Sequence, residues 1–220
     1  MKPSIAFFDL DRTIIGINSA TWWVRRELRL GHLGWRDAMR GAVYISMYQA
    51  GFSRMEQVLR DAAATLSGSS EAALRQRSHD FWHADVFDKI RPGARVAIGE
   101  HRAAGDRLVL LTTSSSYLGE VAAEALGLDD VLCNRFEVVD GCFTGRLIEP
   151  LCFGTGKRVH AQQLAAEAGV SLQDCTFYTD SYSDLPALEV VGQPVVVHPD
   201  PRLARVARKR GWPVQDWGSA

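Results

Sequence analysis

Short, mostly apolar runs alternate along the chain with longer segments of helical periodicity. Each run ends in polar or acidic residues, which is typical of strands buried in a parallel sheet. The predicted strands are Ile5–Phe8, Arg107–Leu111, Thr176–Tyr178 and Pro194–Val197. The predicted fold class is therefore α/β, with a doubly wound parallel sheet whose ligand sites lie at the carboxyl ends of the strands.

Between the second and third of these strands, the pattern predicts two helices and a hairpin. The helices cover residues 117–126 and 155–168. The hairpin consists of residues 136–139 and 142–145, joined by Asp140-Gly141, a dipeptide that favours a tight two-residue turn.

A helical segment interrupts the α/β pattern directly after the first strand. Residues 18–88 contain four stretches of helical periodicity and no strand signal, near 19–30, 36–50, 54–66 and 70–84. An insert at this point lies over the carboxyl ends of the strands and is placed to act as a lid. We expect a catalytic core of residues 1–17 and 89–220 and an all-helical cap of residues 18–88.

Composition narrows the class of protein. The chain has 220 residues, 46% of them hydrophobic, and a formal net charge of -1, which argues against a dedicated nucleic-acid binder. Its four cysteines form no CxxC pair, so reduced thiols and a cytoplasmic location are expected. Asp9 cuts short the first apolar run, and no signal peptide or membrane span is predicted.

Candidate chemistry follows three of the predicted strands. Asp9 and Asp11 follow the first strand, and the hydroxyl-rich run Thr112–Ser116 follows the second as a predicted turn, where hydroxyls and free backbone N–H groups at a helix start suit an oxyanion. Asp180 and Asp184 follow the third strand. Each signal alone is weak, because an isolated Asp more often caps a turn. Together they predict that these residues converge in one crevice at the carboxyl ends of the strands.

Lys157 belongs to the same crevice, because a cation in the first turn of a helix is unfavourable unless an anion lies nearby. Four clustered carboxylates require a further cation, and Mg²⁺ suits oxygen ligands. Asp9 could then attack phosphorus, while Lys157 and Thr112 offset the charge of the transition state. Asp11 could protonate the leaving oxygen and activate water.

With these motifs the sequence resembles the haloacid dehalogenase superfamily of phosphatases. The resemblance rests on DxDxT at Asp9–Thr13, Thr112, Lys157, and the pair Asp180 and Asp184. The insert resembles the helical cap of the subgroup that contains phosphoserine phosphatase. The runs Phe7–Thr13, Phe143–Gly145, Asp180-Ser181 and Pro199-Asp200 resemble the bacterial IB hydrolases, which include phosphatidylglycerophosphatase-like members.

The resemblance implies a role for each matching residue. Asp9 would be the nucleophile and Asp11 the general acid/base, while Thr112, with its neighbour Thr113, and Lys157 would hold the phosphoryl group. Asp9 and Asp180 would bind Mg²⁺ together with the backbone carbonyl of Asp11, and Asp184 would support a metal-bound water.

Two positions depart from the phosphoserine phosphatases. Asn18 stands where they have a substrate-binding Glu, and Ser183 stands where they have Asn before the last Asp. We keep Asn18 as a candidate substrate contact, but a neutral amide does not replace a carboxylate beside a substrate ammonium.

The substrate is expected to be a small or a lipid-derived organic phosphate. Arginines and aromatic residues alternate in the first half of the insert, which suits a solvated helical face or a surface for a lysophospholipid-like substrate with peripheral membrane contact.

Parts of this pattern also fit four further classes of protein: a phosphoserine phosphatase, a phosphotransferase, a dehalogenase and a phospho-accepting receiver-like signalling module. Dehalogenases of the superfamily lack the second Asp, so Asp11 argues against a dehalogenase. In a receiver module the acceptor Asp and the acidic pair would follow different strands, and no long helical insert would be expected. His79 and His83 give only a weak zinc signal, because HExxH is absent.

Overall fold

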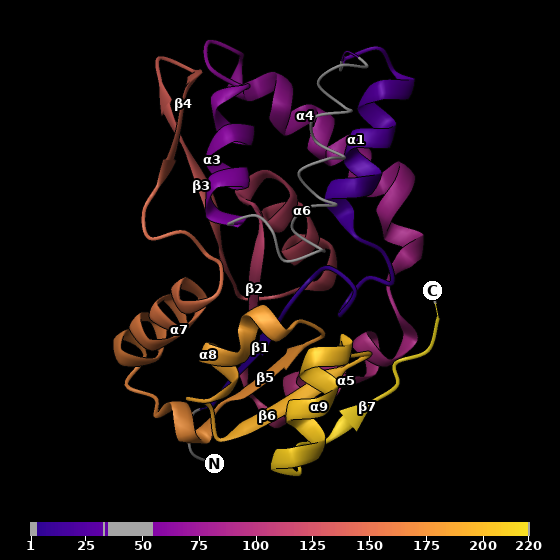
Figure 1. Cartoon of the computed structure of the whole chain (residues 1–220), viewed down its shortest axis with the longest axis vertical. Helices are drawn as coiled ribbons and strands as arrows, with labels where there is room; N and C mark the ends of the chain where they lie inside the picture. The colour runs from indigo at the N-terminus through magenta and orange to yellow at the C-terminus, as the bar shows by residue number, and fades with distance from the viewer. Residues whose placement is uncertain (1–3, 33, 35–54, 220) are drawn as a thin grey trace.

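A seven-stranded sheet forms the centre of the computed structural model, which describes residues 4–32, 34 and 55–219 (Figure 1). The strand order is β4-β3-β2-β1-β5-β6-β7; β3 and β4 are antiparallel, and the other neighbouring pairs are parallel. The strands are β1 (Ile5–Phe8), β2 (Arg107–Ser115), β3 (Asp130–Val139), β4 (Cys142–Ile148), β5 (Thr176–Thr179), β6 (Gln193–Val197) and β7 (Val214–Gln215). The predicted α/β class is confirmed.

Helices cover both faces of this sheet, as a doubly wound fold requires. Successive side chains of β1 point to opposite faces, so Phe8 packs into one apolar core and Phe7 into another. On the Phe8 face lie α5 (Pro92–Ala104) and α6 (Ser116–Leu126). On the Phe7 face lie α7 (Thr155–Glu167), α8 (Leu185–Leu188) and α9 (Pro201–Arg210). A short 3₁₀ turn, η3 (Leu172–Asp174), leads into β5.

The insert after β1 forms helices over one end of the sheet (Figure 1). They are α1 (Ser19–Arg29), α3 (Met55–Ala64) and α4 (Glu71–Phe81), followed by a π-helical turn η1 (Trp82–Val86) and a 3₁₀ turn η2 (Phe87–Lys89). These elements correspond to three of the four predicted helical segments. The fourth, near 36–50, lies outside the described residues, as does most of the arginine- and aromatic-rich stretch. Within the described part of the chain, no helix has the length and apolarity to cross a membrane.

β2 and β3 extend well beyond the strands that the apolar pattern predicts. β2 continues to Ser115, so Thr112 and Thr113 lie in a strand rather than in a turn. The side chains there are β-branched or small, and the strand pairs with β3 across an irregularity between Leu111 and Ser115. β3 begins at Asp130, well before the predicted hairpin, because its first half completes the parallel sheet.

The β3–β4 hairpin reaches the cap, which the sequence does not reveal. Its turn residues Asp140 and Gly141 both have positive φ (51° and 73°), as a tight hairpin turn requires. The Gly68 N–H donates to the Phe143 carbonyl at 2.8 Å, and the Phe143 N–H donates to the Ser69 carbonyl at 3.0 Å. In Figure 1 the hairpin stands beside α3. A part of the core therefore braces the cap.

Phe143 is the apolar centre of this junction. Its ring is buried and packs with Leu74 of α4 and Tyr117 of α6. Removing a buried aromatic ring costs about 3–5 kcal/mol, so Phe143→Ala should lower the free energy of unfolding by that amount. Val139, at the exposed end of β3, gives the matched control, and Val139→Ala should change it by less than about 0.5 kcal/mol. Urea unfolding followed by circular dichroism measures both values, and equal effects would contradict the bracing role.

Candidate active site

The carboxyl ends of β1, β2 and β5 bring the candidate residues to one edge of the sheet. Phe8 of β1 pairs with Leu110 on one side and with Tyr178 on the other. Asp9 therefore leaves the sheet level with the residues that follow Leu110 and Tyr178. The Asp9 N–H donates to the Tyr178 carbonyl at 2.9 Å, which fixes its backbone to β5.

Lys157 is the charged centre of this edge. Its Nζ donates to Asp9 Oδ1 at 2.7 Å and to Asp184 Oδ2 at 2.8 Å, and the side chain is only 2% exposed. The residue lies in the first turn of α7, as predicted. Gly156 allows this position, because a Cβ there would lie 1.8 Å from the Leu151 carbonyl oxygen. The Lys157 ammonium group thus joins Asp9, which follows β1, to Asp184, which follows β5.

Burial and crowding make this site electrostatically strained. Burial raises the pKa of Asp9 to about 7, where Asp184 and Asp11 also act to raise it and Lys157 acts to lower it. Burial and the neighbouring Asp9 and Asp184 raise the pKa of Asp180 to about 8. The pKa of Lys157 is raised despite its burial, because Asp184 and Asp9 favour the ammonium form. The described residues therefore supply too little positive charge for these carboxylates.

Asp184 is held from two sides. Besides the Lys157 ammonium, its Oδ2 accepts a hydrogen bond from Thr179 Oγ1 at 2.7 Å. The loop that carries Asp180 and Asp184 is tied to Asp200, whose N–H donates to the Asp180 carbonyl at 2.8 Å and whose Oδ2 accepts from the Tyr182 N–H at 2.6 Å. Thr179 is a supporting residue that the sequence analysis missed.

Asp11 lies between the core and the cap. Its Oδ1 accepts from the Ser19 N–H at 2.5 Å, and its Oδ2 accepts from Ser19 Oγ at 3.0 Å and from Ser114 Oγ at 3.4 Å. Burial raises the pKa of Asp11, and these hydrogen bonds oppose the shift. Ser114 belongs to the hydroxyl run that was predicted at this site, whereas Ser19 carries no signal in the sequence.

The hydroxyl run has a different backbone from the one predicted but still faces the site edge. Thr112 is buried, and its Oγ1 accepts from the Ser114 N–H at 3.1 Å, which leaves the hydroxyl hydrogen available for an anion. The Thr113 carbonyl accepts from Asn134 Nδ2 at 2.6 Å. Asn134 Oδ1 in turn accepts from the Cys152 N–H at 2.8 Å. Asn134, which the sequence analysis missed, links this run to the loop before Lys157.

Asn18 has a structural task in the described conformation. It is the N-cap of α1, and its Oδ1 accepts from the Thr21 N–H at 3.0 Å and from Thr21 Oγ1 at 2.8 Å. Asn is among the preferred N-cap residues, which explains an amide at this position. The role of Asn18 as a substrate contact stays a prediction.

The carboxyl groups fit a divalent cation by the chemistry of their donors. Asp9 and Asp180 are both buried, and the charge of Asp9 raises the pKa of Asp180, so a nearby cation would relieve their repulsion. Hard carboxylate and carbonyl oxygens are the ligands that Mg²⁺ takes in phosphoryl-transfer sites, together with water and phosphate oxygens. No group of three or more His, Cys, Asp or Glu side chains in the described residues could hold a metal by itself. Such a site would therefore need the backbone carbonyl of Asp11 as well.

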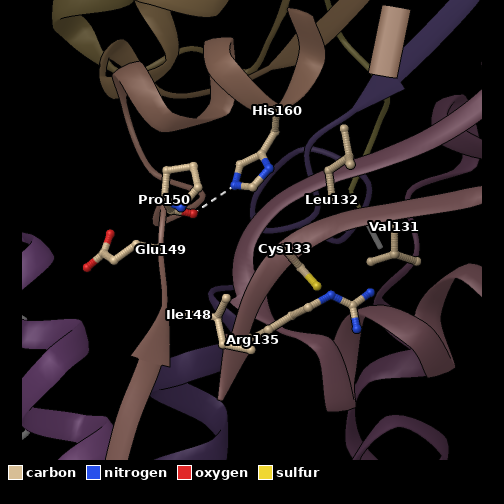
Figure 2. A pocket seen from close by; sticks show the side chains of 8 residues that line it. All are labelled: Val131, Leu132, Cys133, Arg135, Ile148, Glu149, Pro150 and His160. Carbon is tan, nitrogen blue, oxygen red and sulfur yellow. Dashed lines mark hydrogen bonds between the residues drawn. The ribbon is translucent and has the colours of Figure 1, made fainter. Parts of the chain in front are cut away.

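A small cavity lies elsewhere, between β3, the end of β4 and α7 (Figure 2). His160 Nε2 lies 2.9 Å from the Pro150 carbonyl oxygen at its wall. None of the predicted site residues lines it, and its lining includes Val131, Cys133, Arg135, Ile148 and Glu149. The candidate site is thus defined by the strand ends and not by this cavity.

Comparison with known proteins agrees with this geometry. A match to the haloacid dehalogenase-like hydrolase family spans residues 6–189. Phosphoserine phosphatase SerB1 of Mycobacterium tuberculosis is 35% identical over 216 residues, which cover 96% of this chain and 70% of that protein. The histidinol-phosphatase of Neisseria meningitidis serogroup C is 28% identical over 216 residues, covering 96% and 97%. A crystal structure of a protein of unknown function from Bordetella pertussis Tohama I has a TM-score of 0.91 and 30% identity, covering 99% and 100%.

A doubly wound sheet, a helical cap and an aspartate-rich site joined by a buried lysine define a capped phosphatase of the α/β class. The chain belongs to the haloacid dehalogenase-like hydrolase family. It is an enzyme of the phosphatase type rather than a receiver-like signalling module.

Proposed function

We propose that this protein is a Mg²⁺-dependent phosphomonoester hydrolase that works through an aspartyl-phosphate on Asp9. The observation that carries the proposal is the pair of contacts made by Lys157, 2.7 Å from Asp9 and 2.8 Å from Asp184. Lys157 occupies Oδ1 of Asp9, while Oδ2 accepts no hydrogen bond from the described residues. That oxygen is free to attack phosphorus.

In the first half of the reaction, Asp9 Oδ2 forms a bond to phosphorus as the bond to the alcohol oxygen breaks. Asp11 gives its proton to the leaving oxygen, so the alcohol departs neutral. Lys157, which contacts Asp9, and the buried Thr112 hydroxyl are proposed to offset the negative charge on the phosphoryl oxygens. The backbone of Thr113 is proposed to help hold the same phosphoryl group.

In the second half, Asp11 takes a proton from water and the water oxygen attacks phosphorus. The bond to Asp9 then breaks, which releases inorganic phosphate and restores both carboxyl groups. If an alcohol replaces water in this step, the enzyme is a phosphotransferase. Hydrolysis is the proposal, because water needs no binding site beyond Asp11.

Bound Mg²⁺ would supply positive charge beside the phosphoryl group and offset the repulsion between the carboxylates. Asp9, Asp180 and the Asp11 carbonyl are its proposed ligands. Asp184, which pairs with Lys157, is proposed to position that lysine and to support a metal-bound water.

The proposed substrate is a small, polar phosphomonoester. SerB1 and the Neisseria enzyme are named for phosphoserine and histidinol phosphate, and both of these compounds are small and polar. The residues that suggested a lipid-derived substrate lie mostly in 35–54, outside the described part of the chain. A lysophospholipid-like substrate, membrane contact and a cytoplasmic location stay predictions.

Removal of the nucleophile should abolish turnover. Asp9→Asn should lower kcat for an aryl phosphate by about a thousandfold or more, since the amide cannot form the intermediate. Release of inorganic phosphate measures this loss. Asp88, which precedes Lys89 at the end of η2 and outside the site, provides the control Asp88→Asn, and near-normal activity in Asp9→Asn would refute the assignment.

Magnesium should also stabilise the folded protein. A ligand at about 100 times its dissociation constant adds about 2.7 kcal/mol, which corresponds to roughly 5–10 °C in Tm for a chain of this size. Calorimetry with Mg²⁺ and with chelator measures the shift, which should shrink in Asp180→Asn. Full activity and an unchanged Tm after exhaustive chelation would exclude the metal.

The amide at position 18 should weaken selection for L-phosphoserine. A lost charge-assisted hydrogen bond costs about 1.5–3 kcal/mol, or roughly ten- to hundredfold in kcat/KM. We expect kcat/KM to be higher for a small phosphomonoester without an amine, such as glycerol phosphate, than for L-phosphoserine, and lowest for lysophosphatidate. Asn18→Asp keeps the N-cap and adds a charge, so it should raise the relative rate with L-phosphoserine. A preference of the native protein for lysophosphatidate would restore the lipid hypothesis.

A further inference from the structure

Ser19 makes the hydrogen bonds that connect the cap to the proposed acid/base residue. It is the first residue of α1, and only 2% of it is exposed. Its N–H reaches Asp11 Oδ1 at 2.5 Å and its hydroxyl reaches Asp11 Oδ2 at 3.0 Å. The core contributes one weaker bond to the same carboxyl group, from Ser114 Oγ at 3.4 Å. Most of the hold on Asp11 therefore comes from the cap.

The start of α1 is built so that these donors point away from the helix. The Asn18 side chain accepts its N-cap hydrogen bond from the Thr21 N–H, so it does not use the N–H of Ser19. The first N–H groups of any helix lack partners within the helix and require an outside acceptor. Asp11 is that acceptor here, and the Ser19 and Ser114 hydroxyls lie 3.4 Å apart on its other oxygen.

We infer that Ser19 is a positioning residue that orients Asp11 for proton transfer and makes this orientation depend on the position of the cap. A hydroxyl can donate to the ionised carboxylate or accept from the protonated acid, so Ser19 Oγ can hold Asp11 in both halves of the reaction. A shift of α1 away from the sheet edge would break both Ser19 bonds and leave only Ser114. Proton transfer would then be efficient only with the cap in the described position. This inference rests on the proposed acid/base role of Asp11.

Two substitutions remove the bonds stepwise. Ser19→Ala removes the hydroxyl and keeps the N–H. Ser19→Pro removes both donors, yet suits the first position of a helix, and Asn18 already has the extended backbone (φ -96°, ψ 112°) that a residue before proline adopts. Thr21→Val is the matched control, because it loses a hydrogen bond at the same helix start without touching Asp11.

The test compares kcat/KM for 4-nitrophenyl phosphate, whose leaving group needs little protonation, with that for glycerol phosphate, whose leaving group needs it. This ratio covers only the steps up to alcohol release. In Ser19→Ala, kcat/KM for the alkyl ester should fall about tenfold more than kcat/KM for the aryl ester. In Ser19→Pro and in Asp11→Asn, this difference should be about a hundredfold. In Thr21→Val, kcat/KM should fall only slightly and by the same factor for both esters. Far-ultraviolet circular dichroism checks folding, and Ser19→Ala decides alone if Ser19→Pro does not fold.

The outcomes separate this inference from the proposed function. The role of Ser19 would be overturned if Ser19→Ala lowered kcat/KM by the same factor for both esters while Asp11→Asn lowered it much more for the alkyl ester. Asp11 would then remain the acid. A leaving-group effect in Thr21→Val equal to that in Ser19→Ala would also overturn it, because the helix start alone would then be responsible. Equal losses on both esters in Asp11→Asn would contradict the acid role itself.

Discussion

The buried ammonium group of Lys157 is the interaction on which the candidate site depends. A lysine that is 2% exposed keeps its charge only beside anions, and Asp9 and Asp184 provide them at 2.7 and 2.8 Å. The two carboxyls come from loops far apart in sequence, Asp9 after β1 and Asp184 after β5. Loss of one member of a buried ion pair costs about 3–5 kcal/mol, so the fold and the chemistry share this constraint.

The rest of the molecule supports that arrangement from three sides. The sheet places Asp9 and Asp180 at one edge, and Gly156 lets the first turn of α7 approach the Leu151 carbonyl closely enough to insert Lys157. The cap contributes Ser19, which holds Asp11, and the β3–β4 hairpin fastens the cap to the core. Core and cap thus meet around a group of carboxyls whose charge is only partly balanced, and the hairpin joins core and cap at a second place.

Sequence patterns predicted the parts of the site that depend on strand ends. Asp9, Lys157 and Asp180 follow directly from apolar runs and a helix start, and parallel strands bring such residues together whatever the loops do. The extension of β2 through Thr112 was missed, because a hydroxyl-rich run reads as a turn unless its pairing with β3 is known. The supporting contacts of Ser19, Phe143 and Asn134 could not be predicted either, because each joins segments that share no periodicity and meet only through tertiary packing.

The central claim is that Asp9 carries the phosphoryl group during turnover. Acid quenching during steady-state hydrolysis of 4-nitrophenyl phosphate, followed by peptide mass spectrometry, tests it directly. We predict a phosphorylated peptide that contains Asp9, with the modification assigned to Asp9 by fragmentation and absent from Asp9→Asn. A phosphoryl group on Asp11 or Asp180, or hydrolysis at the normal rate by Asp9→Asn, would contradict the account.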